Sequence, residues 1–506
     1  MNPPDSPIPS TAEAPPRRAG TLWIPLLAFA AYALLLAWYT GACAGGSDSS
    51  GYLNNARLLG SGRIVTPTRQ IEGLDPASLP SYAYVPLGFI PHADRAHMIP
   101  TYPMGLPLLV FAASRVASWA LAPGLVMALH SLLGLWLVYR LGRACGLAPG
   151  WAWLAALIMA ASPLYLLMSL QLMSDIPAML WMIAAVLAAW RSRERPWMAV
   201  AAGVALSLAV LLRPVNLLGI VPVAIVLGIS WRRWLLLAAG GLPGAIFLGF
   251  VNHAAYGRIL ITGYGNPGWL FSWANVPGTL VHYGFWLPLL FTPLIVLAPA
   301  VLLLARRQRL PVVLLTSWVF VYFGFHLFYF HTHEDWWYLR FLLPSLPALL
   351  VAALLAAQSL AARASWRPRA WQFGAAATLL LVYGAFCFRH FHIASSGRNE
   401  LLYPQVATWM KEHLPKNAAV ACMQTSGALF CYTDHPLVRW DMLSPADADR
   451  IAAACAAAGR PFYAVLFPFE IEEWGAFTRH LGGHWVQVGS VRYVSIWRLE
   501  PRRPAR

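Results

Sequence analysis

The chain contains 506 residues; 59% of them are hydrophobic, only 11% are charged, and the formal net charge is +16. Because a soluble domain carries roughly a quarter charged residues, this composition excludes a soluble globular protein and predicts a polytopic α-helical membrane protein. We assign the excess positive charge to cytoplasmic loops, where Lys and Arg fix the orientation of membrane helices, and not to binding of nucleic acid.

The chain begins with a polar, Pro-rich stretch at residues 1–20, which predicts a disordered cytoplasmic tail. It is not expected to be a signal peptide, because the apolar run that follows it at about 22–40 is long enough to span a membrane. Arg17 and Arg18 precede that first span, so the positive-inside rule puts the N-terminus in the cytoplasm. Asp48, in GACAGGSDSSGYLNNARLLGSG, then falls on the external side.

A long external loop is predicted over about 42–123. Its segment 105–120 is apolar, but it is short and interrupted by Arg115, so we expect a helix that lies along the outer interface. If this segment crossed the membrane, the later basic clusters RSRER and ARRQR would both face outside. The charge distribution therefore decides against a span here.

Ten further apolar runs follow, and their basic flanks alternate between the two sides. With the first run they make about eleven transmembrane helices in a domain of residues 21–390, with a second external loop at about 252–283. The predicted spans are about 124–141, 151–168, 176–190, 197–212, 215–230, 234–251, 285–304, 311–330, 341–360 and 372–388.

The character of the sequence changes at residues 391–506, where no run is long enough to span a membrane. Five short apolar runs (AAVACMQ, PLVRWD, PFYAVLF, HWVQVG and VRYVSIWRL) alternate with helical patterns, which predicts an extracytoplasmic α/β domain. Six cysteines show no CxxC spacing. Cys422 and Cys431 could form a disulfide in an extracytoplasmic domain or remain buried thiols.

Ionisable residues are rare in this chain, and several lie at the predicted outer ends of spans: Asp48, Asp175, Arg213 and the cluster FHTHEDWWYLRFLLP, which contains Arg340. They come from distant parts of the chain, yet the predicted orientation brings all of them to one face. Charges at such positions are candidates for function, and a convergent polar patch on an apolar protein indicates an active or binding site.

Each of these residues also has a structural interpretation. Asp48 and Asp175 each stand where they could cap the helix that follows. Arg213 and Arg340 could extend to lipid headgroups as interface anchors, and the neighbouring aromatic residues could form an interfacial belt.

The cluster HTHED contains His331, His333, Glu334 and Asp335, which are chemically able metal ligands. Their spacing meets no strict rule for a metal site, so no metal ligands are assigned and no cofactor is required. A divalent cation remains an open alternative.

The chemistry that fits this face combines a base, an anion clamp and a groove for a lipid. An external carboxylate can remove a proton from a substrate hydroxyl, and an arginine can hold a phosphate. The apolar body offers grooves for a lipid tail. These parts together describe transfer of a sugar from a lipid-linked phosphate donor, with the arginine stabilising the charge that grows on the leaving phosphate.

Four stretches resemble the integral-membrane glycosyltransferases of the GT-C type, in particular the protein O-mannosyltransferase-like and lipid A aminoarabinose transferase-like group. They are GGSDSSGYLNNARLL, TYPMGLPLL, LQLMSDIPAM and YLRFLLPSLPALL, and the resemblance covers most of residues 20–390. It implies a bacterial inner-membrane enzyme with a polyprenyl-phosphate sugar donor and a periplasmic acceptor, which is a glycan, a lipid or a protein.

The resemblance also implies roles for individual residues. Asp48 takes the position of the catalytic carboxylate, and Asp175 supports or orients the site. Arg340 takes the position of a contact to the donor phosphate, and Arg213 is a second such contact. The expected substrate-binding residues are Tyr52, Tyr102, His333, Glu334, Asp335 and Tyr338.

One departure from the family pattern concerns the acceptor. The protein mannosyltransferases carry a paired Asp-Glu in the first loop, whereas Asp48 is followed here by Ser49. This difference leaves the acceptor open. Two other classes remain as alternatives: a transporter or flippase of lipid-linked glycans, although no internal repeat is found, and a non-catalytic assembly protein of the cell envelope.

Overall fold

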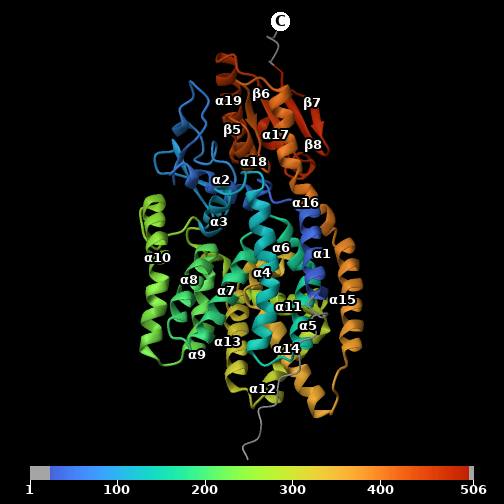
Figure 1. Cartoon of the computed structure of the whole chain (residues 1–506). Helices are drawn as coiled ribbons and strands as arrows, with labels where there is room; N and C mark the ends of the chain where they lie inside the picture. The colour runs from blue at the N-terminus through green and yellow to red at the C-terminus, as the bar shows by residue number, and fades with distance from the viewer. Residues whose placement is uncertain (1–22, 501–506) are drawn as a thin grey trace, which may run out of the picture.

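The computed structural model describes residues 23–500, and side chains from residue 27 onward. The predicted tail at residues 1–20 lies outside these residues. A bundle of helices forms the larger part of the molecule, and a five-stranded sheet with its own helices lies at one end of the bundle (Figure 1). The chain is therefore a polytopic helical protein with a C-terminal α/β region, as the sequence predicts.

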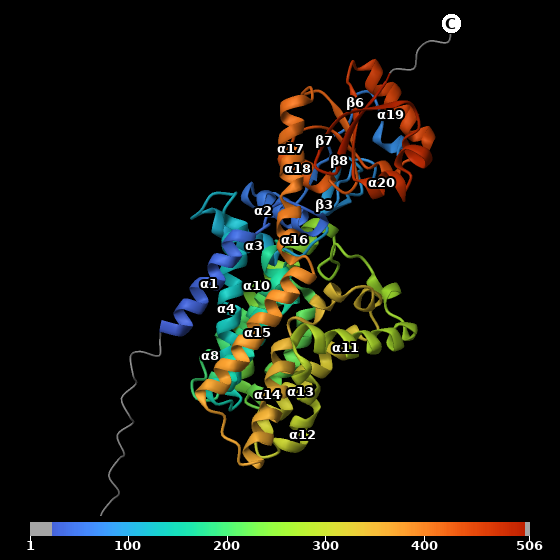
Figure 2. The same ribbon diagram turned by 90° about the vertical axis from the view of Figure 1, so that its right-hand side faces the viewer.

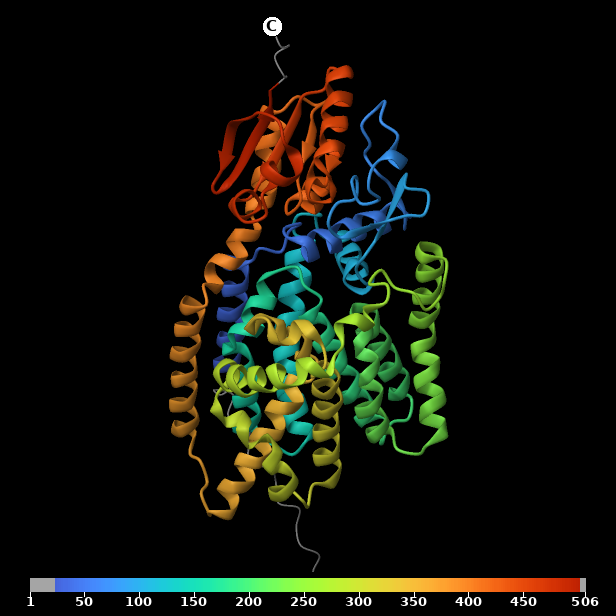
Figure 3. The same cartoon turned by 180° about the vertical axis from the view of Figure 1, so that it is seen from behind.

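Most helices of the bundle coincide with the predicted apolar runs, because a long apolar run is by itself a strong indication of a buried or membrane-spanning helix. Helices α10 and α15 lie at opposite edges of the bundle (Figures 1 and 3). The helices of the bundle are α1 (Trp23–Tyr39), α4 (Ala122–Ala144), α5 (Pro149–Ala161), α6 (Pro163–Leu170), α7 (Asp175–Arg191), α8 (Met198–Leu212), α9 (Ile220–Leu227), α10 (Trp231–Tyr256), α13 (Arg309–His326), α14 (Leu346–Arg363) and α15 (Ala370–His390).

Five helices among the described residues are long and apolar enough to cross a membrane, and seven if each of two bent pairs counts as one span. Four shorter apolar helices accompany them. The prediction of about eleven transmembrane helices therefore stays a prediction.

The span predicted at 285–304 is not one continuous helix. Helix α11 (Val276–Phe291) ends before Thr292, and the chain continues as η6 (Pro293–Ala300) and α12 (Val301–Leu304) after a bend of 115°. Pro293 has no N–H to give to a helical hydrogen bond, and it disfavours the helical conformation at Thr292, whose φ is 96°. Helix α11 consequently lies across the bundle (Figures 2 and 3). Pro163 similarly follows a 60° bend between α5 and α6.

The loop predicted to be external, at about 42–123, has structure of its own. It contains α2 (Ser47–Gly60), a three-stranded antiparallel sheet of order β1-β3-β2 and α3 (Gly105–Ser114). The strands are β1 (Thr66–Pro67), β2 (Phe89–Pro91) and β3 (His97–Pro100). The helix expected at 105–120 is thus shorter than predicted.

The C-terminal region contains all five predicted strands, in the order β5-β4-β6-β8-β7. Strands β5, β4 and β6 are parallel, and β8 and β7 form an antiparallel hairpin beside them. The elements are α16 (Ile393–Glu400), α17 (Leu402–His413), β4 (Ala419–Ala421), α18 (Ser426–Tyr432), β5 (Leu437–Val438), α19 (Pro445–Ala457), β6 (Phe462–Leu466), α20 (Pro468–Glu472), β7 (Trp485–Val491) and β8 (Val494–Leu499). Cys422 and Cys431 are buried free thiols, so no disulfide joins them.

Helix α2 lies where the bundle meets the C-terminal region (Figures 1 and 2). It packs against α18: Asn54 donates a hydrogen bond to the Gly427 carbonyl at 2.9 Å, and Arg57 donates to the Cys431 carbonyl at 2.6 Å. Most of α2 is buried, although its sequence is polar. The C-terminal region therefore helps to fix the helix that begins with Ser47 and Asp48.

We expect Gly427→Ala to lower the midpoint temperature of thermal unfolding in detergent. A Cβ atom there would lie 2.2 Å from Ser50 Oγ and 2.6 Å from the Leu87 carbonyl oxygen. Overpacking of this kind costs about 1–3 kcal/mol, against the roughly 0.5–1 kcal/mol that Ala gains over Gly inside a helix. The matched control is Gly374→Ala on α15, where a Cβ meets nothing within 4 Å. Equal midpoints for the two variants would show that α18 does not press on α2 at Gly427.

Candidate active site

Asp48 lies in the first turn of α2, and its side chain does not cap the helix. The cap position is Gly46, and no side-chain capping bond is formed there. The Asp48 carboxylate instead accepts a hydrogen bond from Arg340, with 3.1 Å between Oδ2 and Nη2. Arg340 lies in η8 (Trp336–Leu342), far away in the chain. The Asp48 carboxylate therefore forms an ion pair with Arg340 and does not cap α2.

Asp175 forms the second ion pair. It is the first residue of α7, is almost fully buried, and makes no capping bond. Its carboxylate pairs with Arg213, which directly follows the last residue of α8. A buried carboxylate without a partner is costly, and Arg213 supplies the partner of Asp175. The Arg213 side chain is therefore directed into the protein and not toward lipid headgroups.

The two ion pairs adjoin each other. The ring of Phe341 lies beside both guanidinium groups, 5.1 Å from that of Arg213 and 5.4 Å from that of Arg340. The four residues that the sequence places on one face thus form a connected cluster of two carboxylates and two guanidinium groups. Their charges balance, which offsets the cost of placing charged groups in a largely buried site.

Arg340 has unused hydrogen-bond donors. Only 8% of the residue is exposed, and no acceptor among the described residues reaches its buried Nε. Its Nη1 faces only the sulfur of Met173, at 3.8 Å. Burial lowers the pKa of Arg340, but the carboxylates of Asp48 and Asp175 raise it more, so the guanidinium stays charged. A guanidinium has five donors, so this one can hold a second anion beside Asp48.

Two tyrosines border the Asp48 end of the site. The Tyr102 hydroxyl bonds to Ser47 Oγ at 2.8 Å, and the Tyr52 hydroxyl bonds to Ser174 Oγ at 2.9 Å. Their ring centroids are 5.1 Å apart. Tyr52 therefore ties α2 to the residue that precedes Asp175, and both rings border the charged cluster.

The HTHED stretch and the Tyr338 that follows it lie near the cluster, and their predicted role in substrate binding stays a prediction. The ring of Tyr338 lies next to Arg340, with 5.8 Å from ring centroid to guanidinium. His331 pairs with Glu334 at 2.6 Å. No hydrogen bond or ion pair among the described residues joins His333, Glu334 or Asp335 to Asp48 or Arg340. In the described part of the chain, the two histidines and two acids of HTHED do not lie close enough together to form a group of metal ligands.

Glu400 is a neighbour of Asp48 that the sequence did not indicate. It is the last residue of α16, which packs against α6 and α1 of the bundle. Its Oε2 accepts hydrogen bonds from the Gly46 N–H at 3.1 Å and from Ser49 Oγ at 2.8 Å. Burial raises the pKa of Glu400, and these two hydrogen bonds oppose the rise. A distant carboxylate thus serves the N-terminus of α2, where negative charge is favourable.

Comparison with known proteins identifies the fold. A family model described as dolichyl-phosphate-mannose-protein mannosyltransferase matches residues 119–260, a segment that contains Asp175 and Arg213 but neither Asp48 nor Arg340. No curated protein matches the chain.

Three solved structures are similar over nearly the whole chain. ArnT from Cupriavidus metallidurans, bound to undecaprenyl phosphate, is 15% identical with a TM-score of 0.57, over 95% of this chain and 98% of ArnT. The Archaeoglobus fulgidus oligosaccharyltransferase, tethered with an acceptor peptide, is 14% identical with a TM-score of 0.51, over 92% and 73%. The arabinofuranosyltransferase AftD from Mycobacteria is 15% identical with a TM-score of 0.51, over 95% and 40%. The chain has the GT-C fold, which confirms the resemblance predicted from its sequence.

Proposed function

We propose that this chain transfers a sugar, a hexose or a pentose, from a polyprenyl-phosphate-linked donor to a periplasmic acceptor. The observation that carries the proposal is the Asp48–Arg340 pair, in which a buried guanidinium retains an unpaired donor beside a carboxylate. The structure of ArnT contains undecaprenyl phosphate, which supports a lipid-phosphate donor. The oligosaccharyltransferase structure contains a tethered acceptor peptide, but the acceptor of this chain is left to be determined. We place the enzyme in the bacterial inner membrane, with the site and residues 391–506 on the periplasmic side.

The reaction follows from the charges. The Asp48 carboxylate takes the proton of an acceptor hydroxyl, and the acceptor oxygen bonds to the anomeric carbon of the sugar. The bond between that carbon and the phosphate oxygen breaks, and the electron pair stays with the polyprenyl phosphate. Arg340 binds this phosphate and stabilises the charge that it gains. Asp175 and Arg213 keep the surroundings of both groups electrically balanced.

The protein mannosyltransferases carry a second acidic residue in the first loop, which this chain lacks. Ser49 stands at that position, and its hydroxyl donates to Glu400. A carboxylate from α16 therefore lies close to Asp48 although the local sequence lacks one. This arrangement supports a related site chemistry with a different contact to the acceptor, so a glycan or a lipid is as compatible as a protein.

The test is mass spectrometry of polyprenyl-phosphate sugars and envelope glycans in a strain that lacks the chain, with and without the wild-type gene restored. We expect one lipid-linked sugar to accumulate, one envelope glycan, lipid or protein to lose the same sugar, and the wild-type gene to reverse both changes. An unchanged pattern of glycans and lipid-linked sugars would reject the proposal and favour a non-catalytic envelope protein.

We expect Glu400→Ala to lower kcat about fivefold, which corresponds to the roughly 1 kcal/mol that a hydrogen bond contributes. The loss leaves the Gly46 N–H and the Ser49 hydroxyl without their acceptor, which loosens the first turn of α2. Donor affinity is expected to stay the same, because Glu400 makes no contact with Arg340.

The diagnostic comparison is Glu400→Gln, which keeps an acceptor oxygen and should recover most of kcat, with Glu412→Ala on the exposed face of α17 as the control. Equal losses of kcat in the Ala and Gln variants would show that the charge of Glu400 acts in the reaction itself. An unchanged kcat in Glu400→Ala would contradict a positioning role.

A further inference from the structure

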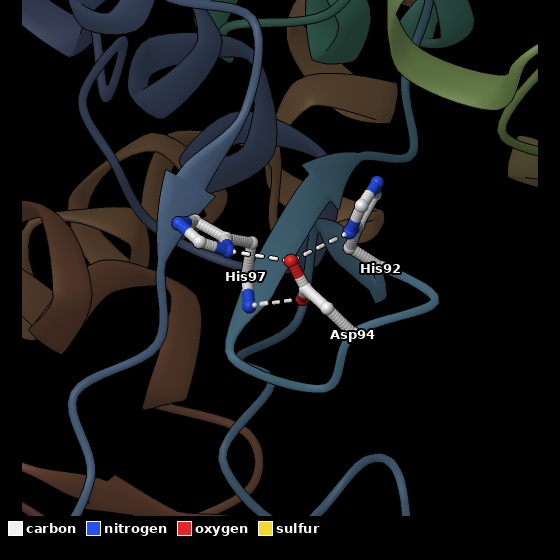
Figure 4. Close-up of side chains that lie close together, drawn as sticks. All are labelled: His92, Asp94 and His97. Carbon is white, nitrogen blue, oxygen red and sulfur yellow. Dashed lines mark hydrogen bonds and ion pairs between the residues drawn. The ribbon is translucent and has the colours of Figure 1, made fainter.

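A second cluster of ligand-type side chains lies on the external sheet, apart from the Asp48–Arg340 pair. His92, Asp94 and His97 come from the hairpin that joins β2 to β3, and their ligand atoms all lie within 4.8 Å of one another (Figure 4). This is the only such group of three or more His, Cys, Asp or Glu side chains in residues 23–500. We propose that these three residues bind one zinc ion.

The backbone of the hairpin brings the two histidines together. Pro91 is paired with Met98 in the sheet, so His92 and His97 form the next pair at the end of the strands, and the His92 N–H bonds to the His97 carbonyl at 3.0 Å. Side chains that face each other across an antiparallel pair have Cβ atoms only about 4.5–5.5 Å apart. The turn is closed by Arg95, which has a φ of 57°.

Asp94 holds the turn with one oxygen and faces the histidines with the other. Its Oδ1 accepts the N–H groups of Ala96 at 3.0 Å and of His97 at 2.9 Å. Its Oδ2 lies 2.8 Å from His97 Nδ1 and 3.1 Å from His92 Nδ1. The carboxylate is thus oriented by the backbone before any ion arrives, as ligand groups commonly are in metal sites.

The spacing of these atoms suits zinc. With zinc–nitrogen and zinc–oxygen distances of about 2.0–2.2 Å, neighbouring ligands of a tetrahedral ion lie about 3.3 Å apart. The two distances from Oδ2 are a few tenths of an ångström shorter, so a small opening of the turn admits the ion. His92 Nδ1 is shielded from solvent, and its polar neighbour is Asp94 Oδ2 at 3.1 Å, so the nitrogen already faces the place where the ion would bind.

The cluster is open to solution on one side. The side chains of His92, Asp94 and His97 are 37%, 44% and 45% exposed, and they line an open pocket of about 520 Å³ together with Arg63, Val65 and Pro67. An ion can therefore enter from solution, and the pocket has room for a water molecule as the fourth ligand. The ion would fix the hairpin that leads through Thr101 to Tyr102.

The test is direct zinc binding by the full-length protein in detergent. The protein is stripped with a chelator, dialysed against zinc, and measured for metal content, and amide exchange of residues 92–97 is followed with and without zinc. We expect one zinc per chain in the wild type and slower exchange in the turn. Asp94→Asn keeps the oxygen that holds the turn but loses a charged ligand, and should weaken zinc binding by at least about tenfold.

His92→Ala combined with His97→Ala should abolish binding. His413→Ala, at an exposed position at the end of α17, is the control and should bind normally. Transfer activity is not needed for this test, so its outcome is separate from that of the proposed function. Less than one zinc per chain in the wild type, or equal zinc content in the wild type and in the double variant, would overturn the proposal. Exchange in the turn that does not respond to zinc would also overturn it, and would mean that the three residues form a hydrogen-bonded turn only.

Discussion

Asp48→Asn is expected to lower the rate of sugar transfer by about 10²- to 10⁴-fold, the range that a positioned general base contributes. Asparagine has the shape of aspartate and keeps an oxygen that can accept the hydrogen bond from Arg340. It cannot take up the proton of the acceptor hydroxyl. The rate is measured as the loss of lipid-linked sugar in membranes that contain equal amounts of each protein.

A matched control separates loss of the base from loss of the fold. Asp434→Asn removes a fully exposed carboxylate that lies 3.8 Å from Arg69, and surface pairs of this kind contribute little. Asp48→Asn leaves the buried Arg340 without its ion-pair partner, so its midpoint of thermal unfolding should lie below that of Asp434→Asn. Both variants should still be folded at the temperature of the transfer assay. Transfer at the wild-type rate by Asp48→Asn would assign Asp48 a structural role and remove the basis of the proposed reaction.

Arg340→Gln is expected to weaken binding of a polyprenyl phosphate by about 10- to 100-fold. Hydrogen bonds to charged groups contribute about 1.5–3 kcal/mol, and each 1.4 kcal/mol changes affinity tenfold. Arg340→Lys keeps the charge but loses the planar pair of donors, so its affinity should lie between the two. Binding is measured on the purified protein in nanodiscs, and Arg498→Gln on the exposed face of β8 is the control.

The loss of Arg340 also leaves Asp48 without its partner, which destabilises the protein apart from any effect on the donor. The double variant Asp48→Asn with Arg340→Gln separates these effects. It removes both charges, so we expect it to regain stability while it still fails to bind the polyprenyl phosphate. Recovery of binding in the double variant would contradict a direct contact between Arg340 and the phosphate.

Hydropathy predicted the helical parts of this chain well, because an apolar run of sufficient length has few alternatives to a buried or membrane-spanning helix. The run at 124–141 became α4, Ala122–Ala144, and the five expected strands of the C-terminal region are all present. The break inside the span predicted at 285–304 was not foreseen, because the hydropathy of a window does not register what Pro293 does to the residue before it.

The site was predictable as a set of residues and not as a set of contacts. The predicted membrane orientation placed Asp48, Asp175, Arg213 and Arg340 on one face, but it could not say which carboxylate pairs with which arginine. The pairs are decided by the packing of α2 and α7 against η8 and the end of α8. The roles of these residues in a reaction remain predictions.

Glu400 could not have been found from the local sequence. It lies 351 residues after Ser49, to which it is bonded, and no spacing rule connects two residues so far apart. The one available signal was its place just after the last apolar run, on the same predicted side as Asp48. Long-range contacts of this kind arise from tertiary packing, which periodicity does not describe.

The most direct test of the central claim is to follow the fate of the donor with the purified protein in liposomes. The liposomes contain the lipid-linked sugar that accumulates in the strain lacking the chain, together with an envelope extract as the source of acceptor. We predict that the wild-type protein releases free polyprenyl phosphate, detected by mass spectrometry, and that Asp48→Asn does not. An intact donor after incubation with the wild-type protein would contradict a transferase, and movement of that intact donor to the other leaflet would indicate a transporter.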